Sequence, residues 1–201
     1  MKFPDNRYDW DYWEVEKFQS PNRLQEFFNQ LHLSGCQIEK VKTVGLFFDS
    51  PLTFWSPNKY CQKNTLDEPL LIHLGDGREL EICYSDGSTV KAGVNTLPAE
   101  VKSAYKKKQN TAFYFSNLNG STIKNVVVHS TTEYPEFTGA HGEELSEEQD
   151  AYIEGISFEL TNGLTLHLTN YYDYCAFEVK NADGELVELE GDKVKKIKCG
   201  K

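Results

Sequence analysis

Residues Leu70–Asn95 read LLIHLGDGRELEICYSDGSTVKAGVN, with alternating apolar positions on both sides of Asp76-Gly77. An Asp-Gly pair accepts the positive φ that a tight chain reversal requires, so this stretch predicts a β-hairpin. A second turn signal at Ser85–Ser88 predicts another strand, which runs through Val90 to Val94. The stretch therefore predicts three successive strands.

The same pattern recurs about 85 residues further along the chain, near the C-terminus. FELTNGLTLHL at Phe158–Leu168 repeats IHLGDGRELEI at Ile72–Ile82, with Asn162-Gly163 at the turn. Upstream, LNGSTIKNV at Leu118–Val126 repeats LSGCQIEKV at Leu33–Val41. The sequence thus predicts one unit used twice. Neither hairpin buries enough apolar surface to offset its own ordering entropy, so we expect a core shared by both.

The register of each hairpin is predicted by facing the apolar residues of its two strands. Histidine and glutamate then pair on the other face, as half-solvated cross-strand contacts. Their spacing supplies too few ligands for a metal site. The first loop is then Asp76-Gly77-Arg78. The expected partners are Leu74 with Leu80, Ile72 with Ile82 and His73 with Glu81, and in the second hairpin Leu160 with Leu166, Phe158 with Leu168 and Glu159 with His167.

Two short helices and several further strands are predicted around the hairpins. Ser20-Pro21 is a helix-start signature, and the apolar residues that follow have helical spacing up to about Leu31. A second short helix is expected from Leu97. The other predictions are an aromatic strand over 8–16, one or two strands over 37–49, a loop over 50–66, and strands over 123–128, 171–179 and 185–189.

The predicted fold class is β-rich α+β, made of two similar hairpin-containing units with one or two short helices. With 201 residues and 39% hydrophobic content, the chain is long and apolar enough to bury a core. We expect an N-terminal aromatic strand over 1–19, a first unit over 20–97, a second unit over 98–189 and a basic tail over 190–201. The two units can also form one continuous domain.

The composition is that of an acidic, soluble protein. A net charge of −10 disfavours a nucleic-acid partner and is complementary to a basic protein. The five cysteines include no C-x-x-C, which is typical of a reducing compartment. No segment predicts a signal peptide or a membrane span, so we expect a cytoplasmic protein without membrane contact. The oligomeric state is left open.

An acidic segment and a tyrosine-rich segment are the expected partner-binding elements. Thr131–Ala151 is rich in acids and poor in residues that could enter a core, and Tyr171–Val179 predicts a strand. Acids speed encounter with a basic surface, and tyrosines supply contact area. A solvated loop and an ordinary strand are the alternative interpretations. The expected binding residues are Glu136, Glu143, Glu144, Glu147, Glu148, Tyr171, Tyr172 and Tyr174.

Signatures of catalysis are missing from the sequence. It contains no G-x-S-x-G, no phosphate-binding loop, no H-E-x-x-H and no G-x-G-x-x-G after a strand. We therefore expect no catalytic residue, no cofactor and no metal.

With Glu143–Glu148 and Tyr171–Tyr174, its size and this lack of motifs, the chain resembles the small acidic immunity proteins that bacteria make against polymorphic or contact-dependent toxins. The repeated L-x-I-x-L-x-D-G pattern is also similar to an uncharacterised bacterial family. The resemblance implies a non-enzymatic module that neutralises a basic toxin. Two alternatives remain: a structural or small-ligand module with a groove between the units, and a hydrolase that uses His129 or His167 with nearby acids.

Overall fold

The computed structural model describes residues 13, 15–43, 64–66, 69–85, 89–97, 116–132, 151–170, 175–185 and 187 of the 201-residue chain. These residues form strands, one α-helix, α1 (Pro21–Gln30), and a short 3-10 helix, η3 (Ser116–Leu118). The strands are β1 (Glu16–Phe18), β2 (Ile38–Thr43), β3 (Asn64–Leu66), β4 (Leu70–Leu74), β5 (Glu79–Ser85), β6 (Thr89–Val94), β7 (Ile123–Thr131), β8 (Tyr152–Leu160), β9 (Thr165–Asn170) and β10 (Cys175–Lys180).

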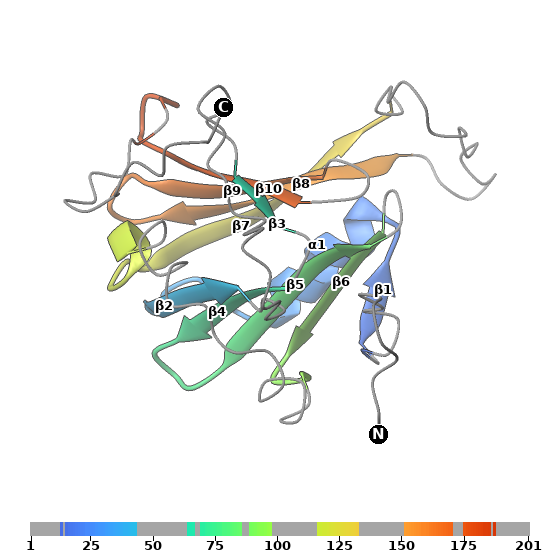
Figure 1. Ribbon diagram of the computed structural model, residues 1–201, viewed down its shortest axis with the longest axis horizontal. Coiled ribbons are helices and arrows are strands. Elements are labelled where there is room, and N and C mark those ends of the chain that lie inside the picture. The colour runs from blue at the N-terminus through green and yellow to red at the C-terminus, as the bar shows by residue number, and fades with distance from the viewer. Residues whose placement is uncertain are drawn as a thin grey trace, which may run out of the picture.

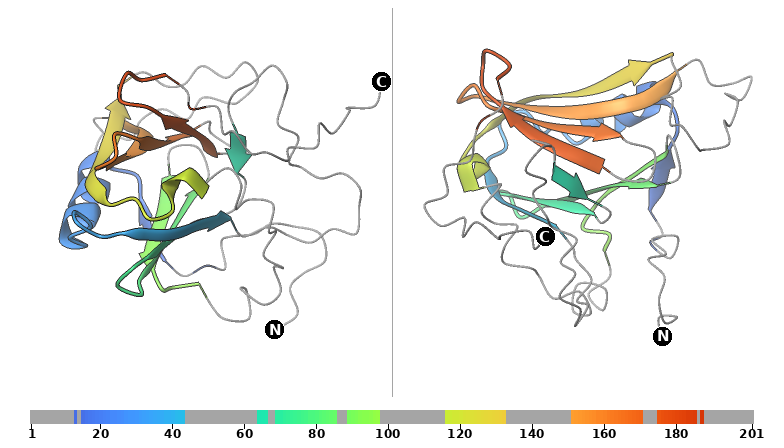
Figure 2. Two further views of the ribbon diagram at one scale, coloured as in Figure 1. Left: turned by 90° about the vertical axis from the view of Figure 1, so that its left-hand side faces the viewer. Right: turned by 45° about the horizontal axis from the view of Figure 1, so that its top comes forward.

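The strands form two five-stranded antiparallel sheets. The first has the order β1-β6-β5-β4-β2, and the second has the order β3-β10-β9-β8-β7. The two sheets lie as two layers (Figure 1), and turned views show α1 along one side of them (Figure 2). The helix contacts β7 of the second sheet and β1 of the first. The β-rich α+β fold class predicted from the sequence is confirmed.

One apolar core joins the two sheets and the helix. Both hairpins contribute to it, so the prediction of a shared core is confirmed. In addition, β3 precedes the first hairpin in sequence but pairs with β10 of the second sheet, which links the two halves of the chain. The core side chains include Leu24 and Phe28 from α1, Ile72, Leu80, Ile82 and Val90 from the first sheet, and Ile156, Phe158, Leu166, Leu168 and Phe177 from the second.

The helix α1 begins and ends close to the predicted limits. Ser20 has the extended backbone of an N-cap residue, and Pro21 occupies the first turn, where its missing N–H costs no helical bond. The helix ends at Gln30, one residue before the predicted Leu31. Its buried face carries Leu24 and Phe28, in agreement with the apolar spacing in the sequence.

The side chain of Gln25 pairs with the outer edge of β7. Its Nε2 donates to the carbonyl of Val126 at 3.0 Å, and its Oε1 accepts from the amide of Val128 at 2.8 Å. A strand at this edge would make the same two backbone bonds. Gln25 therefore covers part of an edge that could otherwise pair with another chain.

Replacing Gln25 with alanine should lower the free energy of unfolding by about 1–3 kcal/mol, because it removes two hydrogen bonds from a partly buried edge. Chemical denaturation monitored by circular dichroism measures this change. Gln30→Ala is the matched control, since Gln30 is exposed on the same helix, and it should change stability by no more than about 0.5 kcal/mol. Equal effects of the two substitutions would contradict the edge-covering role.

The hairpin register predicted from the sequence is wrong by two residues. Ile72 faces Leu80 in the first hairpin, and Phe158 faces Leu166 in the second. The turn begins earlier than expected: Leu74 accepts from the amide of Gly77 at 2.9 Å and donates to the carbonyl of Arg78 at 2.8 Å. The first loop is therefore Gly75-Asp76-Gly77, and its last residue, Gly77, has a φ of +87°.

A shift of two residues keeps every side chain on its predicted face, because strand side chains alternate. The apolar faces were therefore predicted correctly even though the cross-strand partners were not. The predicted His/Glu pairs are replaced by others. His73 faces Glu79, with its Nδ1 at 3.0 Å from the Glu79 carboxylate, and His167 faces Ser157.

The two hairpin turns have the same local geometry. In the second, Leu160 accepts from the amide of Gly163 at 3.1 Å and donates to the carbonyl of Leu164 at 2.9 Å, and Gly163 has a φ of +84°. Each hairpin also pairs with a further strand, and the register of that pairing shifts at an equivalent position in both sheets. The register shifts between Ile38 and Lys40 on β2, and between Ile123 and Asn125 on β7.

Reciprocal backbone bonds join the segments that precede β2 and β7. Gly35 donates to the carbonyl of Ile123 at 2.8 Å, and Gly120 donates to the carbonyl of Ile38 at 2.7 Å. Ile38 donates to Ser121 at 2.8 Å, and Ile123 donates to Cys36 at 2.9 Å. The two sheets are thus bonded to each other where β2 and β7 begin.

Other elements differ from the sequence predictions or lie outside the described residues. The strand β3 occurs within 50–66, where a loop was predicted, and its hydrogen-bond partners come from distant β10. Glu185 and Val187 are not in a strand, although Val187 donates to the carbonyl of Val179 at 2.9 Å. The second predicted helix, most of the aromatic strand over 8–16 and the tail over 190–201 lie outside the described residues.

Candidate functional site

The predicted partner-binding residues all lie outside the part of the chain that the structure describes. The strands that flank them are described. The acidic segment connects β7 to β8, and the tyrosine segment connects β9 to β10. These residues are Glu136, Glu143, Glu144, Glu147 and Glu148 in the first segment, and Tyr171, Tyr172 and Tyr174 in the second.

The strand directions bring both connections to one end of the second sheet. Thr131, the last residue of β7, is the cross-strand partner of Tyr152, the first residue of β8. Asn170 at the end of β9 is likewise the partner of Cys175 at the start of β10. Because β8 and β9 are antiparallel, the end of β9 lies at the same end of the sheet as the start of β8. The chain therefore leaves and re-enters the sheet at this end for both segments.

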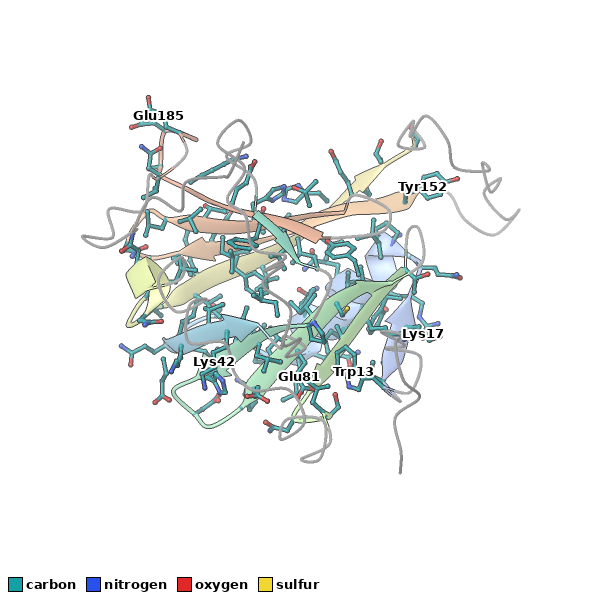
Figure 3. All side chains as sticks on the ribbon, viewed as in Figure 1. Trp13, Lys17, Lys42, Glu81, Tyr152 and Glu185 are labelled. Atoms are coloured by element: carbon teal, nitrogen blue, oxygen red, sulfur yellow. The ribbon has the colours of Figure 1, made fainter. Side chains whose placement is uncertain are left out.

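This end is opposite to the tight turns of the second sheet. Figure 3 labels Tyr152 at one end of the sheet and Glu185, just after the turn that follows β10, toward the other. That turn has the same pattern as the hairpin turns, with Asn181 donating to the carbonyl of Glu185 at 2.9 Å. The second sheet thus has one end with short, ordered turns and one end where the acidic and tyrosine segments attach.

Two histidines and a serine form a hydrogen-bonded cluster on the second sheet, on the face directed away from the core. His129 Nε2 and His167 Nδ1 each lie 2.7 Å from Ser157 Oγ. The two rings are edge to face, with centroids 5.2 Å apart. The side chains come from the adjacent strands β7, β8 and β9, with Ser157 on the middle one. Ser157 is only 7% exposed, and the histidines are partly exposed.

Gly155 makes room for this cluster. It lies opposite His129 in the register of β7 and β8. A Cβ atom at this position would be 2.5 Å from the carbonyl oxygen of Leu168 and 3.2 Å from Cε1 of His167. Any larger residue would therefore displace the His167 ring or the neighbouring strand.

A serine between two histidines can serve as a nucleophile when one imidazole removes its proton. Acyl transfer also needs hydrogen-bond donors that stabilise an oxyanion. Ser157 lies within a central strand, where the backbone amides are engaged in pairing with β7 and β9. Its hydroxyl is also almost fully buried. The geometry therefore suits a polar binding cluster better than acyl transfer.

A second polar cluster is buried on the outer face of the first sheet. Glu81 is fully buried, and its carboxylate accepts from the amides of Thr96 at 2.8 Å and Leu97 at 3.0 Å. The Thr96 hydroxyl donates to the same carboxylate and accepts from the Trp13 indole at 3.0 Å. Trp13 and Glu81 lie close together on this face in Figure 3. The cluster fixes the N-terminal tryptophan and the chain after β6 against the sheet.

At the first hairpin turn, an ion pair holds Arg78 between the loop and the helix end. Arg78 Nε donates to Asp76 Oδ2 at 2.8 Å, and Arg78 also donates to the carbonyl of Leu31 at 2.5 Å and to Cys36 Sγ at 3.2 Å. The Arg78 side chain, and then its backbone amide, lower the pKa of Asp76 to about 2, and the Asp76 hydrogen bond raises the pKa of Arg78. The pair ties the turn to the segment after α1.

Asp76 gives a stability contribution with a defined pH range. Its pKa is depressed in the folded state, so the contribution is present above the ordinary value of 3.8 and is lost as the pH falls toward about 2. We expect the wild-type chain to be more stable than Asp76→Asn at neutral pH and the difference to shrink between these two values. Thermal unfolding at several pH values measures it. A difference that stays constant down to pH 2 would contradict the ion pair.

Neither a metal-ligand group nor a membrane-spanning helix is found in the described ranges. No three or more His, Cys, Asp or Glu residues gather there closely enough to hold a metal ion. Among the described helices, none has the length and apolar character needed to cross a membrane. No protein-family model, curated protein or solved structure matches the chain.

Sequence reasoning considered His129 and His167 separately and missed Ser157 as the residue that joins them. The signal was present in β8, where Gly155, Ser157 and Glu159 alternate with apolar residues that enter the core. The predicted register placed Glu159 opposite His167. With the observed register, the alternation and the pairing together bring Ser157 next to His167.

Proposed function

We propose that this chain is a non-enzymatic cytoplasmic module that binds a basic protein, in the manner of an immunity protein that neutralises a basic toxin. The expected contact residues are the acids of the β7–β8 connection and the tyrosines of the β9–β10 connection. The two segments would act together, since acids steer the encounter and tyrosines supply buried contact area.

Two observations support this proposal: one segment of the sequence is rich in acids, and described strand ends flank both this segment and the tyrosine segment. Thr131–Ala151 contains seven acidic residues and no lysine or arginine. It therefore contributes −7 to the chain's formal net charge of −10. The strand ends that flank this segment lie at the same end of the second sheet as those that flank the tyrosines. A negative field from one region raises the association rate with a basic partner more than the same charge spread over the surface.

The test uses the product of the gene next to the one that encodes this chain, because the resemblance to immunity proteins implies that the toxin is encoded there. The two proteins are mixed, and binding is measured by titration calorimetry at about 0.05 M and about 0.5 M salt. We expect binding that weakens at high salt. Replacing Glu143, Glu144, Glu147 and Glu148 with glutamine should weaken low-salt binding at least about tenfold.

A matched control separates the acidic segment from overall charge. Glu26, Glu39, Asp183 and Glu185 are exposed and belong to other segments of the chain. Changing these four to amides alters the net charge by the same amount, and we expect binding close to that of the wild-type chain. Similar losses from both sets, or no binding to the neighbouring product, would count against the proposal.

We further propose that the two halves arose by duplication of one hairpin unit. Support comes from the matching turn bonds, the register shifts at equivalent places on β2 and β7, and the reciprocal bonds between Gly35–Ile38 and Gly120–Ile123. If the turns are equivalent, replacing Thr161–Gly163 with the Gly75–Gly77 sequence should change stability by no more than about 1 kcal/mol; Leu164 is kept because it packs against the core. Loss of the fold after this exchange would argue against equivalence.

A further inference from the structure

His129, Ser157 and His167 bring two imidazole nitrogens to one hydroxyl oxygen. Two imidazole nitrogens from different strands, His129 Nε2 and His167 Nδ1, point at one oxygen atom from a distance of 2.7 Å. The two nitrogens are therefore no further apart than twice that distance. The strands on both sides of β8 fix the two histidines, so the approach of the rings comes from the sheet itself.

The Ser157 hydroxyl cannot donate a hydrogen bond to both imidazoles at once. A serine hydroxyl has one proton, so it donates to one imidazole nitrogen and must accept a hydrogen bond from the other. A neutral histidine can place its single proton on either ring nitrogen. Both rings can therefore turn a lone pair toward the same point without losing a proton from the cluster.

We propose that His129 and His167 bind a divalent first-row transition-metal ion, with the Ser157 oxygen as a third ligand. Imidazole nitrogens select zinc, copper, nickel or cobalt over magnesium and calcium, which prefer oxygen. Zinc–nitrogen bonds are about 2.0–2.1 Å long, so an ion between two converging nitrogens requires small ring movements. Solvent completes the coordination, because both histidines are partly exposed.

An acidic residue on β10 and a glycine on β8 lie beside His167. Glu178 is the cross-strand partner of His167, and its carboxylate is paired with Lys180 at 3.1 Å. Glu178 is therefore next to His167 in the sheet and forms an ion pair with Lys180. Gly155 has no side chain, which leaves room for the His167 ring. This inference revises the sequence-based expectation that the chain has no metal site, and it is independent of the proposed partner.

Zinc titration of the untagged full chain tests the proposal. Titration calorimetry with zinc chloride should show one site per chain, and histidine ring NMR should show zinc-dependent shifts for two of the five histidines. We expect His129→Asn and His167→Asn each to weaken zinc binding at least about tenfold. His32→Asn is the control, since His32 is exposed with a φ of +49° that asparagine tolerates, and it should bind like the wild-type chain.

A variant with a higher affinity for zinc gives a readout that misfolding cannot produce. Ser157→Cys places a thiol between the two imidazoles, and a thiolate is a stronger zinc ligand than a hydroxyl. Zinc should then bind at least about tenfold more tightly, and cobalt should give the absorption band of a thiolate complex. Zinc that binds equally well to the wild-type chain and to both histidine variants would overturn the proposal. So would zinc affinity that Ser157→Cys leaves unchanged.

Discussion

Replacing Phe158 with alanine is expected to lower the free energy of unfolding by about 3–5 kcal/mol, the usual cost of removing a buried aromatic ring. Phe158 is fully buried on β8, between its cross-strand neighbours Val126 and Leu166. Its ring meets the ring of Phe28 from α1 edge to face, with centroids 6.0 Å apart. The substitution thus removes contacts within the second sheet and between that sheet and the helix. Urea denaturation measures the loss.

Two further variants make this prediction specific. Phe158→Leu keeps most of the volume and should cost less than the alanine variant. Ile72→Ala alters the corresponding position in the first hairpin and should cost about 2–5 kcal/mol. A loss below about 1 kcal/mol for Phe158→Ala would mean that the ring is not in the core.

Replacing Glu81 with alanine is the second change with a large expected effect. The carboxylate accepts from two backbone amides and from the Thr96 hydroxyl. Removal leaves these donors without an acceptor, at about 1–3 kcal/mol for each buried group, so we expect a loss of about 3 kcal/mol or more. Trp13 fluorescence during denaturation reports the change in this cluster, because the indole donates to Thr96. The measurement is made in a background with the other two tryptophans replaced by phenylalanine.

Glu81→Gln is the matched control. Glutamine keeps the size of the side chain and one acceptor oxygen, so part of the hydrogen bonding survives, and the loss should be smaller than that of Glu81→Ala. Equal losses from the two variants would show that the amides of Thr96 and Leu97 do not depend on an oxygen at this position.

Local signals in the sequence predicted the parts of the fold that depend on neighbouring residues. The spacing of apolar residues after Ser20-Pro21 indicated α1 to within one residue of its end. Alternation indicated the strands and their buried faces. The predicted register was wrong because the sequence does not show which loop position Gly77 occupies: it is the last residue of the loop and not the middle one.

The remaining features depend on contacts between distant residues. The strand β3 is short and exists through its pairing with β10, so its own sequence gave no alternation to detect. Lys91 is fully buried on β6 although lysine is among the most exposed residue types. Gln25 reaches an edge strand some hundred residues away in sequence. Ser157 became a candidate only when the strand register brought His129 and His167 to it.

Both sheets should unfold together if they share one core. Histidine ring NMR during urea denaturation follows both sheets in one sample, since His73 lies on the first sheet and His129 and His167 lie on the second. A shared core and the pairing of β3 with β10 predict one common midpoint for all three side chains. Separate midpoints for His73 and the other two would contradict a single fold built from both halves of the chain.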